Sequence, residues 1–288
     1  MPISAQSPLV TELQSKTQAA QAEFERRHTF AKEWLGVRGV TLSGLRAHST
    51  KLLAGATLGS ALLLSTPVLP ILRTASSSQI HSTAEVASDL FTNLKQLSNE
   101  GLNSETKTFI TQSITQVFGV SSSFELDGNQ LPTYIGSIGL EQHLARFAGD
   151  TLEQHDSYRE EGMAPGLGAF GYFAEAGKSQ ATMVAQEKYY VVAQTFLIAD
   201  WNSNWGKLKD WYRFRKFLVI NPDTGQAVVA DLGDSGPAVW TGKQFGGSPE
   251  VMTALGFYPQ KTRGKILFLY LDDPGNSIPL GPLTRKGG

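Results

Sequence analysis

The amino-acid sequence predicts an α+β protein with a membrane-spanning helix near its N-terminus, a helical stalk region and a C-terminal β-barrel that carries one short helix. Three observations lead to this prediction: an uncharged apolar segment over residues 52–72, helical periodicity after it, and short β-branched and aromatic runs from Lys188 onward. The predicted divisions are a cytoplasmic helical tail over 1–50, a transmembrane anchor or signal segment over 51–73, a helical and mixed linker domain over 74–180, and a barrel domain over 181–288.

The composition is that of an ordinary globular protein. The 288 residues are 18% charged and 41% hydrophobic, and the formal net charge is −1. Charge therefore gives no argument for a nucleic-acid partner, and we predict none. The sequence has no cysteine, which excludes a thiol nucleophile, a thiolate zinc site and a disulfide framework. We predict no cofactor.

The segment over residues 52–72 is long enough to cross a bilayer, which takes about 20 apolar residues in a helix. Its flanks differ in charge: residues 74–99 hold Lys95 against Glu85 and Asp89, whereas the upstream flank is basic. Against Glu33, that flank carries Arg26, Arg27, Lys32, Arg38, Arg46 and Lys51. The positive-inside rule therefore predicts a cytoplasmic N-terminus and an extracytoplasmic C-terminal domain.

Two alternatives to a single-pass anchor remain open for this segment. A cleaved signal would release the protein to the periplasm or cell wall, with the small residues at 75–78 as the cleavage region. A buried helix of a soluble protein is the other interpretation, because Pro67, Pro70 and several small residues dilute the hydrophobicity.

Helical patterns follow the apolar segment. Ser82 and Glu85 form a capping-box pattern ahead of apolar residues at helical spacing, and a second amphipathic stretch runs over 104–118. These two helices predict a stalk or a small packing unit. Asp127 and Gly128 then predict the turn of a β-hairpin.

Residues 119–180 contain two patterns that resemble ligand sites. Gly166, Gly168 and Gly171 spell GxGxxG, but no strand precedes them and no helix opens after them, so we expect a flexible glycine-rich loop. His143 and His155 lie among acidic residues, and metal ligation is conceivable there. Their spacing matches no common metal site, so we expect solvated helix residues and predict no metal.

The region after Lys188 is strand-like. Its β-branched and aromatic runs are YYVVAQTFLIA, RFRKFLVINP, QAVVADLGD and KILFLYLDD. Between the last two, Ser248 as N-cap and Pro249 at the first helical position predict a short helix that ends near Gly256. Strands with one inserted helix in about 100 residues predict a compact barrel.

One block of this region resembles a known family. The matching positions are Asn221, Gly225, the run 227–230, Asp234, Gly236, Pro237, Gly242, Ser248, Leu255 and Gly256. The block VINPDTGQAVVADLGDSGPAVWTGKQFGGSPEVMTALGF resembles the core of double-psi β-barrel proteins of the expansin and rare-lipoprotein-A type, over roughly residues 185–275. The resemblance implies a six-stranded double-psi-like barrel. It is incomplete, because Gly246 and Gly247 replace an Asp-Leu pair and no histidine follows His155.

The resemblance also implies that Asp234 is catalytic. Relatives that act on peptidoglycan use a lytic transglycosylase mechanism, in which one aspartic acid protonates the glycosidic oxygen and then accepts the proton of the sugar's C6 hydroxyl. Such an acid needs a raised pKa, which partial burial beside a second carboxylate provides. The supporting carboxylates in this prediction are Asp231, Asp272 and Asp273, and the substrate-binding residues are Trp211, Tyr212, Trp240 and Thr241.

Each of these assignments has a plainer interpretation. Asp234 precedes Ser-Gly-Pro, and Asp272 and Asp273 precede Pro-Gly, so all three fit turns. The aromatic residues could cap the open end of the barrel instead of stacking on sugars. We therefore predict a cell-envelope protein that cleaves or remodels peptidoglycan or a related glycan and contacts the membrane through residues 52–72. Non-catalytic glycan binding and a structural scaffold are the alternatives.

Overall fold

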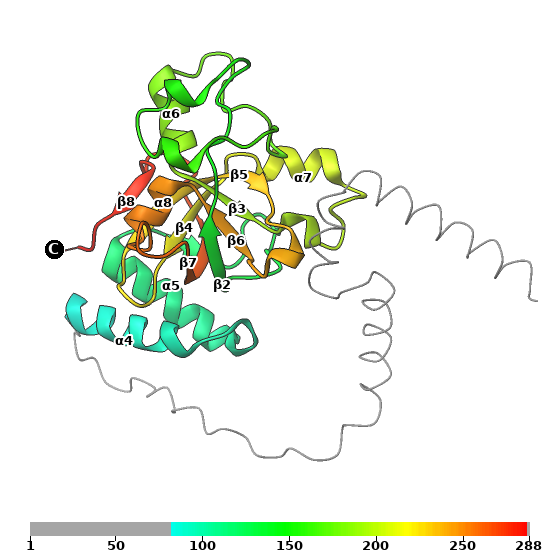
Figure 1. Cartoon of the computed structure of the whole chain (residues 1–288). Coiled ribbons are helices and arrows are strands. Elements are labelled where there is room, and N and C mark those ends of the chain that lie inside the picture. Colours follow the sequence, from blue (N-terminus) through cyan, green and yellow to red (C-terminus); the bar gives the residue numbers. More distant parts are fainter. Residues whose placement is uncertain (1–81, 287–288) are drawn as a thin grey trace, which may run out of the picture. The chain divides into compact units, whose positions relative to one another are not determined.

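The computed structural model describes residues 82–286, and the predicted cytoplasmic tail and the apolar segment 52–72 lie outside these described residues. Among residues 82–286, no helix has the length and apolarity needed to span a membrane. Figure 1 shows a barrel with α4 and α5 on one side and α6 on the other.

The helices and strands alternate along the chain without a clean division into an all-helical and an all-strand part. In order, they are α4 (Thr83–Gln96), η1 (Asn99–Gly101), α5 (Ser104–Phe118), β1 (Ser122–Ser123), β2 (Ile135–Leu140), η2 (Leu152–Gln154), η3 (Arg159–Glu161), α6 (Gln180–Lys188), β3 (Tyr190–Ala193), η4 (Thr195–Leu197), α7 (Trp205–Tyr212), β4 (Lys216–Ile220), β5 (Ala227–Ser235), η5 (Val239–Thr241), β6 (Phe245–Gly247), α8 (Pro249–Ala254), β7 (Arg263–Leu271) and β8 (Gly281–Leu283).

Six strands close into a barrel. They pair in the order β7, β2, β6, β3, β5, β4, and β4 pairs again with β7. The β2–β6 and β3–β5 pairs are parallel and the others are antiparallel. β1 adds to β7 and β8 adds to β5 outside the closed ring. The α+β class and the six-stranded barrel are thus confirmed, and the mixed barrel is compatible with a double-psi arrangement.

Aromatic residues fill the middle of the barrel. Phe217 of β4, Phe268 of β7 and Phe245 of β6 are buried, and their rings stack with both centroid separations at 4.6 Å. Since β6 and β7 are not neighbours in the sheet, the stack of Phe245 on Phe268 crosses the interior. Three buried aromatic rings contribute a large part of the apolar burial that stabilises this core.

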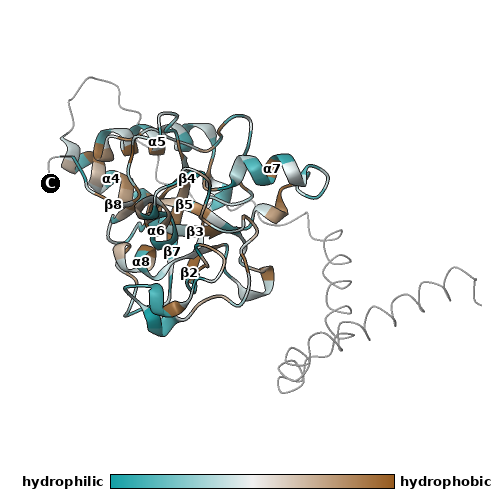
Figure 2. Ribbon diagram, turned by 90° about the horizontal axis from the view of Figure 1, so that it is seen from above, coloured by the Kyte–Doolittle hydropathy of each residue, from teal (hydrophilic) through white to brown (hydrophobic). Residues whose placement is uncertain are grey.

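Helices α4 and α5, the first two among the described residues, pack on the barrel. Leu90 of α4 and Ile114 of α5 are fully buried and belong to the same apolar core as the strands. Figure 2 shows α4 and α5 with both brown and teal residues, as amphipathic packing requires. The predicted capping box is present, because the Ser82 side chain accepts a hydrogen bond from Glu85 N and Glu85 bonds back.

The predicted boundary at residue 180 falls within one compact unit. β2, which precedes this boundary, lies between β6 and β7 in the barrel. The described residues 82–286 belong to one compact unit. Residues on both sides of position 180 therefore build the same barrel.

The structure contains the predicted hairpin turn and helix cap, and a loop at the predicted glycine-rich segment. Asp127 and Gly128 have φ values of 50° and 78°, and Leu126 bridges Asn129 across them, as in a two-residue hairpin turn. Residues 162–177 contain no helix and no strand. α8 begins as predicted, with the Ser248 side chain accepting a hydrogen bond from Val251 N and Pro249 in the first turn.

Candidate functional site

Asp234 lies where β5 leaves regular pairing with β3. Val191 pairs with Leu232 but Val192 pairs with Asp234, so Gly233 is an extra residue in β5. Such a bulge changes the direction of the side chains that follow it. It separates the environment of Asp234 from that of Asp231, which lies before the bulge.

Two backbone amides hold one oxygen of Asp234. Ala169 N and Ser235 N donate to Oδ1 over 2.5 Å and 2.7 Å, and Oδ2 receives neither bond. Burial raises the pKa of the Asp234 carboxyl, and the two amide bonds act in the opposite direction. The carboxyl is thus half-buried with one oxygen anchored and a raised pKa, which suits an acid that must also accept a proton.

Gly168 permits the loop to approach this carboxyl. A Cβ atom at this position would lie 3.0 Å from the Gly233 carbonyl oxygen and 3.1 Å from Asp234 Cγ. These contacts are tighter than ordinary van der Waals contact. One glycine of the GxGxxG pattern is therefore explained by the approach to an aspartate, with no phosphate required.

Glu141 is a second carboxylate that the sequence analysis did not identify. It directly follows β2, and its Oε1 pairs with Lys243 Nζ at 2.6 Å. Burial raises the pKa of Glu141, Lys243 lowers it, and the negative charge of Asp234 raises it. Glu141 therefore lies within electrostatic range of Asp234.

The unusual Gly246 makes room for Glu141. A Cβ atom on Gly246 would meet Glu141 Cγ and Oε1 at 2.5 Å. This is the position where the resembling family has an aspartate side chain. In this chain, the space beside residue 246 holds a carboxylate that comes from another strand end. In the sequence Glu141 is only one of the acidic residues near His143, so no pattern assigns it to this site.

The structure does not bring Asp231 to this site. Its side chain is buried and accepts a hydrogen bond from Gln186 Nε2 at 2.5 Å. Burial raises the pKa of Asp231 to about 7. The lysines that act on its charge are Lys216 and Lys178, so Asp231 belongs to a separate environment.

Asp272 and Asp273 fit the turn interpretation. Asp272 is exposed. Asp273 accepts bonds from Ser277 N and Ile278 N and pairs with Lys216 Nζ at 2.9 Å. Although burial acts to raise the pKa of Asp273, these partners lower it to about 2. Asp273 thus stabilises the turn and is not available as an acid.

Of the predicted sugar-binding residues, Trp240 and Thr241 lie in the chain segment between Asp234 and Lys243. Trp240 is 90% exposed in η5, a short turn that begins two residues after Pro237. Thr241 Oγ1 donates to Ala238 O and accepts from Lys243 N, so it shapes the turn. The turn leads directly to Lys243, the partner of Glu141.

Trp211 and Tyr212 lie elsewhere. Tyr212 is fully buried, and its hydroxyl bonds Tyr270 Oη at 2.9 Å. A sugar ring cannot reach it, so its predicted stacking role is wrong. Trp211 donates to Asp127 Oδ2 and lies 4.0 Å from the guanidinium of Arg215. Both rings pack against Tyr270 of β7, with centroid separations of 5.8 Å for Trp211 and 6.5 Å for Tyr212.

Exposed apolar side chains occur in the two chain segments that hold Ala169 and Lys243, the partners of Asp234 and Glu141. Leu167, next to Gly168, is 54% exposed, and Val239, next to Trp240, is 59% exposed. Gln194 Nε2 fixes the loop from Pro237 to Lys243, because it donates hydrogen bonds to the carbonyl oxygens at both ends of that loop. Exposed apolar side chains in these segments offer a suitable surface for the C–H face of a sugar.

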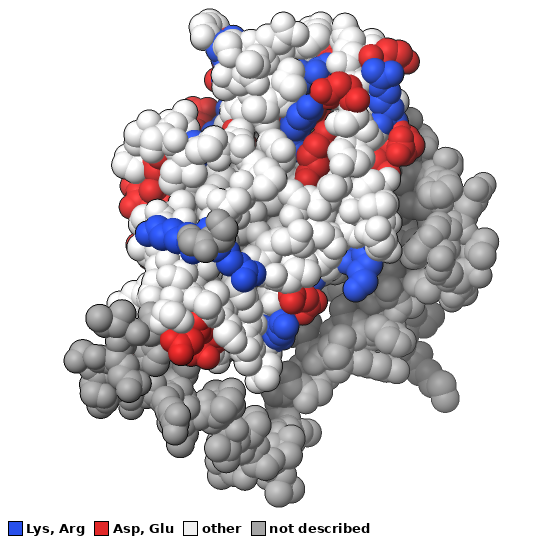
Figure 3. All heavy atoms as spheres, turned by 90° about the vertical axis from the view of Figure 1, so that its left-hand side faces the viewer, with Lys and Arg blue, Asp and Glu red and all other residues white. Residues whose placement is uncertain are grey.

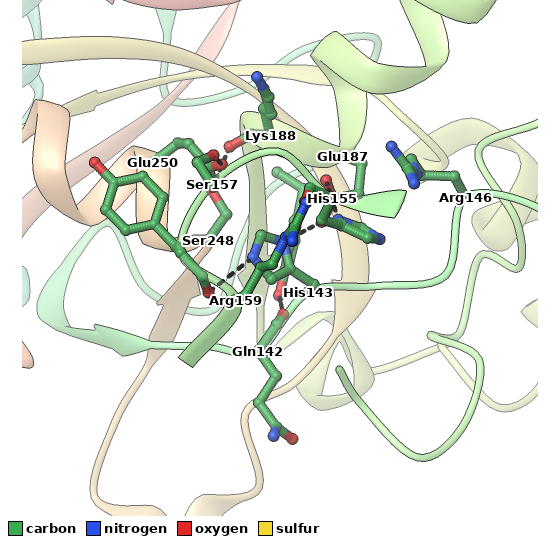
Figure 4. A network of polar contacts seen from close by, with 12 residues as sticks. Gln142, His143, Arg146, His155, Ser157, Arg159, Glu187, Lys188, Ser248 and Glu250 are labelled. Carbon is green, nitrogen blue, oxygen red and sulfur yellow. Dashed lines mark hydrogen bonds and ion pairs between the residues drawn. The ribbon is translucent and has the colours of Figure 1, made fainter. Parts of the chain in front are cut away.

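The two histidines that were expected in solvent are buried. His143 and His155 are 1% and 2% exposed, neither lies in a helix, and both contact Glu187. The prediction of solvated helix residues is therefore wrong, because the loop between β2 and α6 folds back on α6. Figure 4 shows these side chains converging with Glu187.

Compared with known protein families and with curated proteins, the sequence matches none. The geometry around Asp234 therefore carries the functional proposal.

Proposed function

We propose that this chain is a cell-envelope protein that cleaves or remodels peptidoglycan or a related glycan by a lytic transglycosylase-like mechanism. The single observation that carries the proposal is the half-buried Asp234 carboxyl, with Oδ1 anchored by two amides and its pKa raised by burial. The partial resemblance to rare-lipoprotein-A and expansin barrels supports it, as does the mixed six-stranded barrel.

Asp234 performs both proton transfers in this mechanism. The protonated carboxyl gives its proton to the glycosidic oxygen as the bond from the anomeric carbon to that oxygen breaks. The sugar's C6 hydroxyl oxygen then bonds to the anomeric carbon, and its proton passes to the Asp234 carboxylate. The product is a 1,6-anhydro sugar, and no water is consumed. The Ala169 and Ser235 amides stabilise the carboxylate between the two transfers.

Glu141 and Trp240 have supporting roles. The transition state of glycosidic cleavage carries positive charge at the anomeric centre. The negative charge of Glu141, fixed by Lys243, favours that charge near Asp234. Trp240, which is 90% exposed, offers an indole face on which a pyranose ring can stack.

Location and partners complete the proposal. The charge difference across residues 52–72 supports a single-pass anchor with residues 74–288 on the extracytoplasmic side. On the face shown in Figure 3, the charged residues are scattered, and acidic groups lie near basic ones. This face therefore gives no electrostatic footprint for nucleic acid.

A second candidate function is non-catalytic glycan binding. Val239 and Trp240 are adjacent apolar residues with exposed side chains. Such a pair favours a binding surface whether or not the protein cleaves a bond. Expansin-like wall loosening is the form of this alternative that the resemblance implies.

One assay separates the two functions. The full-length chain, kept in mild detergent, is incubated with purified sacculi, and soluble products are analysed by mass spectrometry. Anhydro-muropeptides are the expected products. Co-sedimentation without any released anhydro product would overturn the catalytic proposal and favour binding. Trp240→Ala should weaken co-sedimentation, with Trp205→Ala as the matched control, because Trp205 is a 39% exposed indole outside this turn.

A further inference from the structure

His143, His155 and Glu187 form a buried cluster on the side of the barrel covered by α6. His143 lies three residues after β2, His155 directly follows η2, and Glu187 lies in the last turn of α6. One donor atom from each lies within 4.8 Å of the other two. Each of the three is at most 2% exposed, and Figure 4 shows them pointing toward one another.

Both nitrogens of each imidazole ring face an acceptor oxygen. His143 Nδ1 lies 2.8 Å from Glu187 Oε1, and its Nε2 lies 3.2 Å from Tyr158 O. His155 Nδ1 lies 3.4 Å from Glu187 Oε2, and its Nε2 lies 3.2 Å from Asp150 Oδ2. A neutral imidazole has one N–H, so each ring would leave one nitrogen lone pair against an acceptor.

A cation between the two Nδ1 atoms and Glu187 resolves this conflict. Each ring would keep its proton on Nε2 and offer the Nδ1 lone pair as a ligand. The Nε2–H groups would then donate to Tyr158 O and Asp150 Oδ2, which is the outer-shell arrangement typical of metal-bound histidines. Asp150 is itself fixed by Arg146 Nε and Nη2 at 2.9 Å and 2.7 Å.

Buried carboxylates surround the cluster, and a divalent cation would stabilise their charge. Glu187, Asp150 and Glu250 are carboxylates, and Arg146 is the buried guanidinium beside them. Glu250 is 8% exposed, accepts from Ser157 Oγ at Oε1, and has a buried Oε2 without a partner. Its charge acts on both Glu187 and His143. A divalent ion beside Glu187 would offset the negative charge of these buried carboxylates.

We propose that His143, His155 and Glu187 bind a divalent transition-metal ion. Two imidazole nitrogens and one carboxylate oxygen suit Zn²⁺. Ligands about 2.0–2.1 Å from a tetrahedral ion lie about 3.3 Å apart. His143 Nδ1 lies 2.8 Å from Glu187 Oε1 and His155 Nδ1 lies 3.4 Å from Glu187 Oε2, and one ligand atom from each residue lies within 4.8 Å of the other two. Small side-chain shifts bring the donors to that geometry.

The metal has a structural role. Residues 141–179 connect β2 to α6 with no regular structure beyond two short 3-10 turns. So long a connection needs anchors. The ion ties two points of this loop to α6, which leads directly into β3 of the barrel.

The test uses the full-length chain in mild detergent, purified without a metal-binding tag. Elemental analysis should find about one equivalent of Zn²⁺ or a related divalent metal. Removal of the metal by a chelator should lower the melting temperature, and added Zn²⁺ should restore it, with a change of about 5–10 °C. Absence of bound metal together with no thermal response to Zn²⁺ would overturn the proposal.

Variants identify the ligands. His143→Gln and His155→Gln should each lose the stoichiometric metal, while the combined His28→Gln, His48→Gln and His81→Gln variant should retain it, because these are the chain's other histidines. Asp150→Asn should weaken Zn²⁺ affinity about 10–100-fold. Full metal retention by His155→Gln, or its loss from the triple variant, would contradict the assignment. If the ligand variants do not fold, X-ray absorption of the wild-type chain must still show two imidazole ligands.

Discussion

Asp231 and Asp234 show how strongly one strand can separate the chemistry of two aspartates. Both belong to β5, but the bulge at Gly233 lies between them. Asp234 receives two backbone N–H groups at one oxygen. Asp231 is buried against Gln186, and its Oδ1 and Gln186 Oε1 both lack partners. A proton on Asp231 supplies a donor that this pair needs.

Asp231 should therefore make the stability of the fold depend on pH. Burial raises its pKa to about 7, against about 3.9 in an unfolded chain. Between these values the folded state binds more protons, so the free energy of unfolding falls as pH rises from about 4 through about 7. Asp231→Asn should flatten this dependence and raise stability at pH 8 by roughly 1–3 kcal/mol, because its amide donates to Gln186 Oε1. Urea unfolding at pH 5 and pH 8 measures the effect. Asp272→Asn is the control, and an unchanged pH slope in Asp231→Asn would exclude Asp231 as its source.

Elements with strong local signals were predictable from the sequence. The β-branched and aromatic runs of β4, β5 and β7 and the Ser248 cap of α8 depend on neighbouring residues in the chain. β2 was missed because its sequence, IGSIGL, has two glycines. Side chains at Gly136 and Gly139 would collide with Gln244 and Lys243. That requirement arises only when distant segments pack, so no local pattern reveals it.

The candidate sites divide in the same way. Asp234 was found because a motif of adjacent residues marks it. Glu141 and the His143, His155 and Glu187 cluster were not found, because the long loop between β2 and α6 brings them together. The spacing of these residues in the chain is set by the path of that loop and not by a helix or strand. For this reason the spacing of the two histidines matched no common metal site.

The glycine loop over 162–177 gives a prediction at this scale. Gly168→Val should push Ala169 N away from Asp234 Oδ1, because even a Cβ atom lies 3.1 Å from Asp234 Cγ. Glycan cleavage should fall about tenfold or more, since hydrogen bonds to charged groups contribute about 1.5–3 kcal/mol. Gly166→Val is the matched control, because a Cβ atom there meets nothing within 4 Å. The rate of muropeptide release measures the activity of both variants. Equal rates would show that the approach of the loop at Gly168 does not support catalysis by Asp234.

At the scale of the whole molecule, one barrel joins residues from both sides of position 180, and the apolar segment 52–72 precedes it in the chain. A reporter that is active only in the cytoplasm should work when fused after His48 and be silent when fused after Gly288. The basic flank of the segment is the physical reason. Activity of the fusion after Gly288 would place the barrel on the cytoplasmic side, away from peptidoglycan.

The most direct test of Asp234 as the acid and base compares the wild-type chain with Asp234→Asn on purified sacculi. Asn keeps the shape and can still accept the Ala169 and Ser235 amide bonds, but it transfers no proton. Release of anhydro-muropeptides should fall about 10²–10⁴-fold, while the melting temperature and co-sedimentation with sacculi stay near wild type. The exposed Asp272→Asn variant should cleave normally. Wild-type cleavage by Asp234→Asn would contradict the assignment of Asp234 as the acid and base.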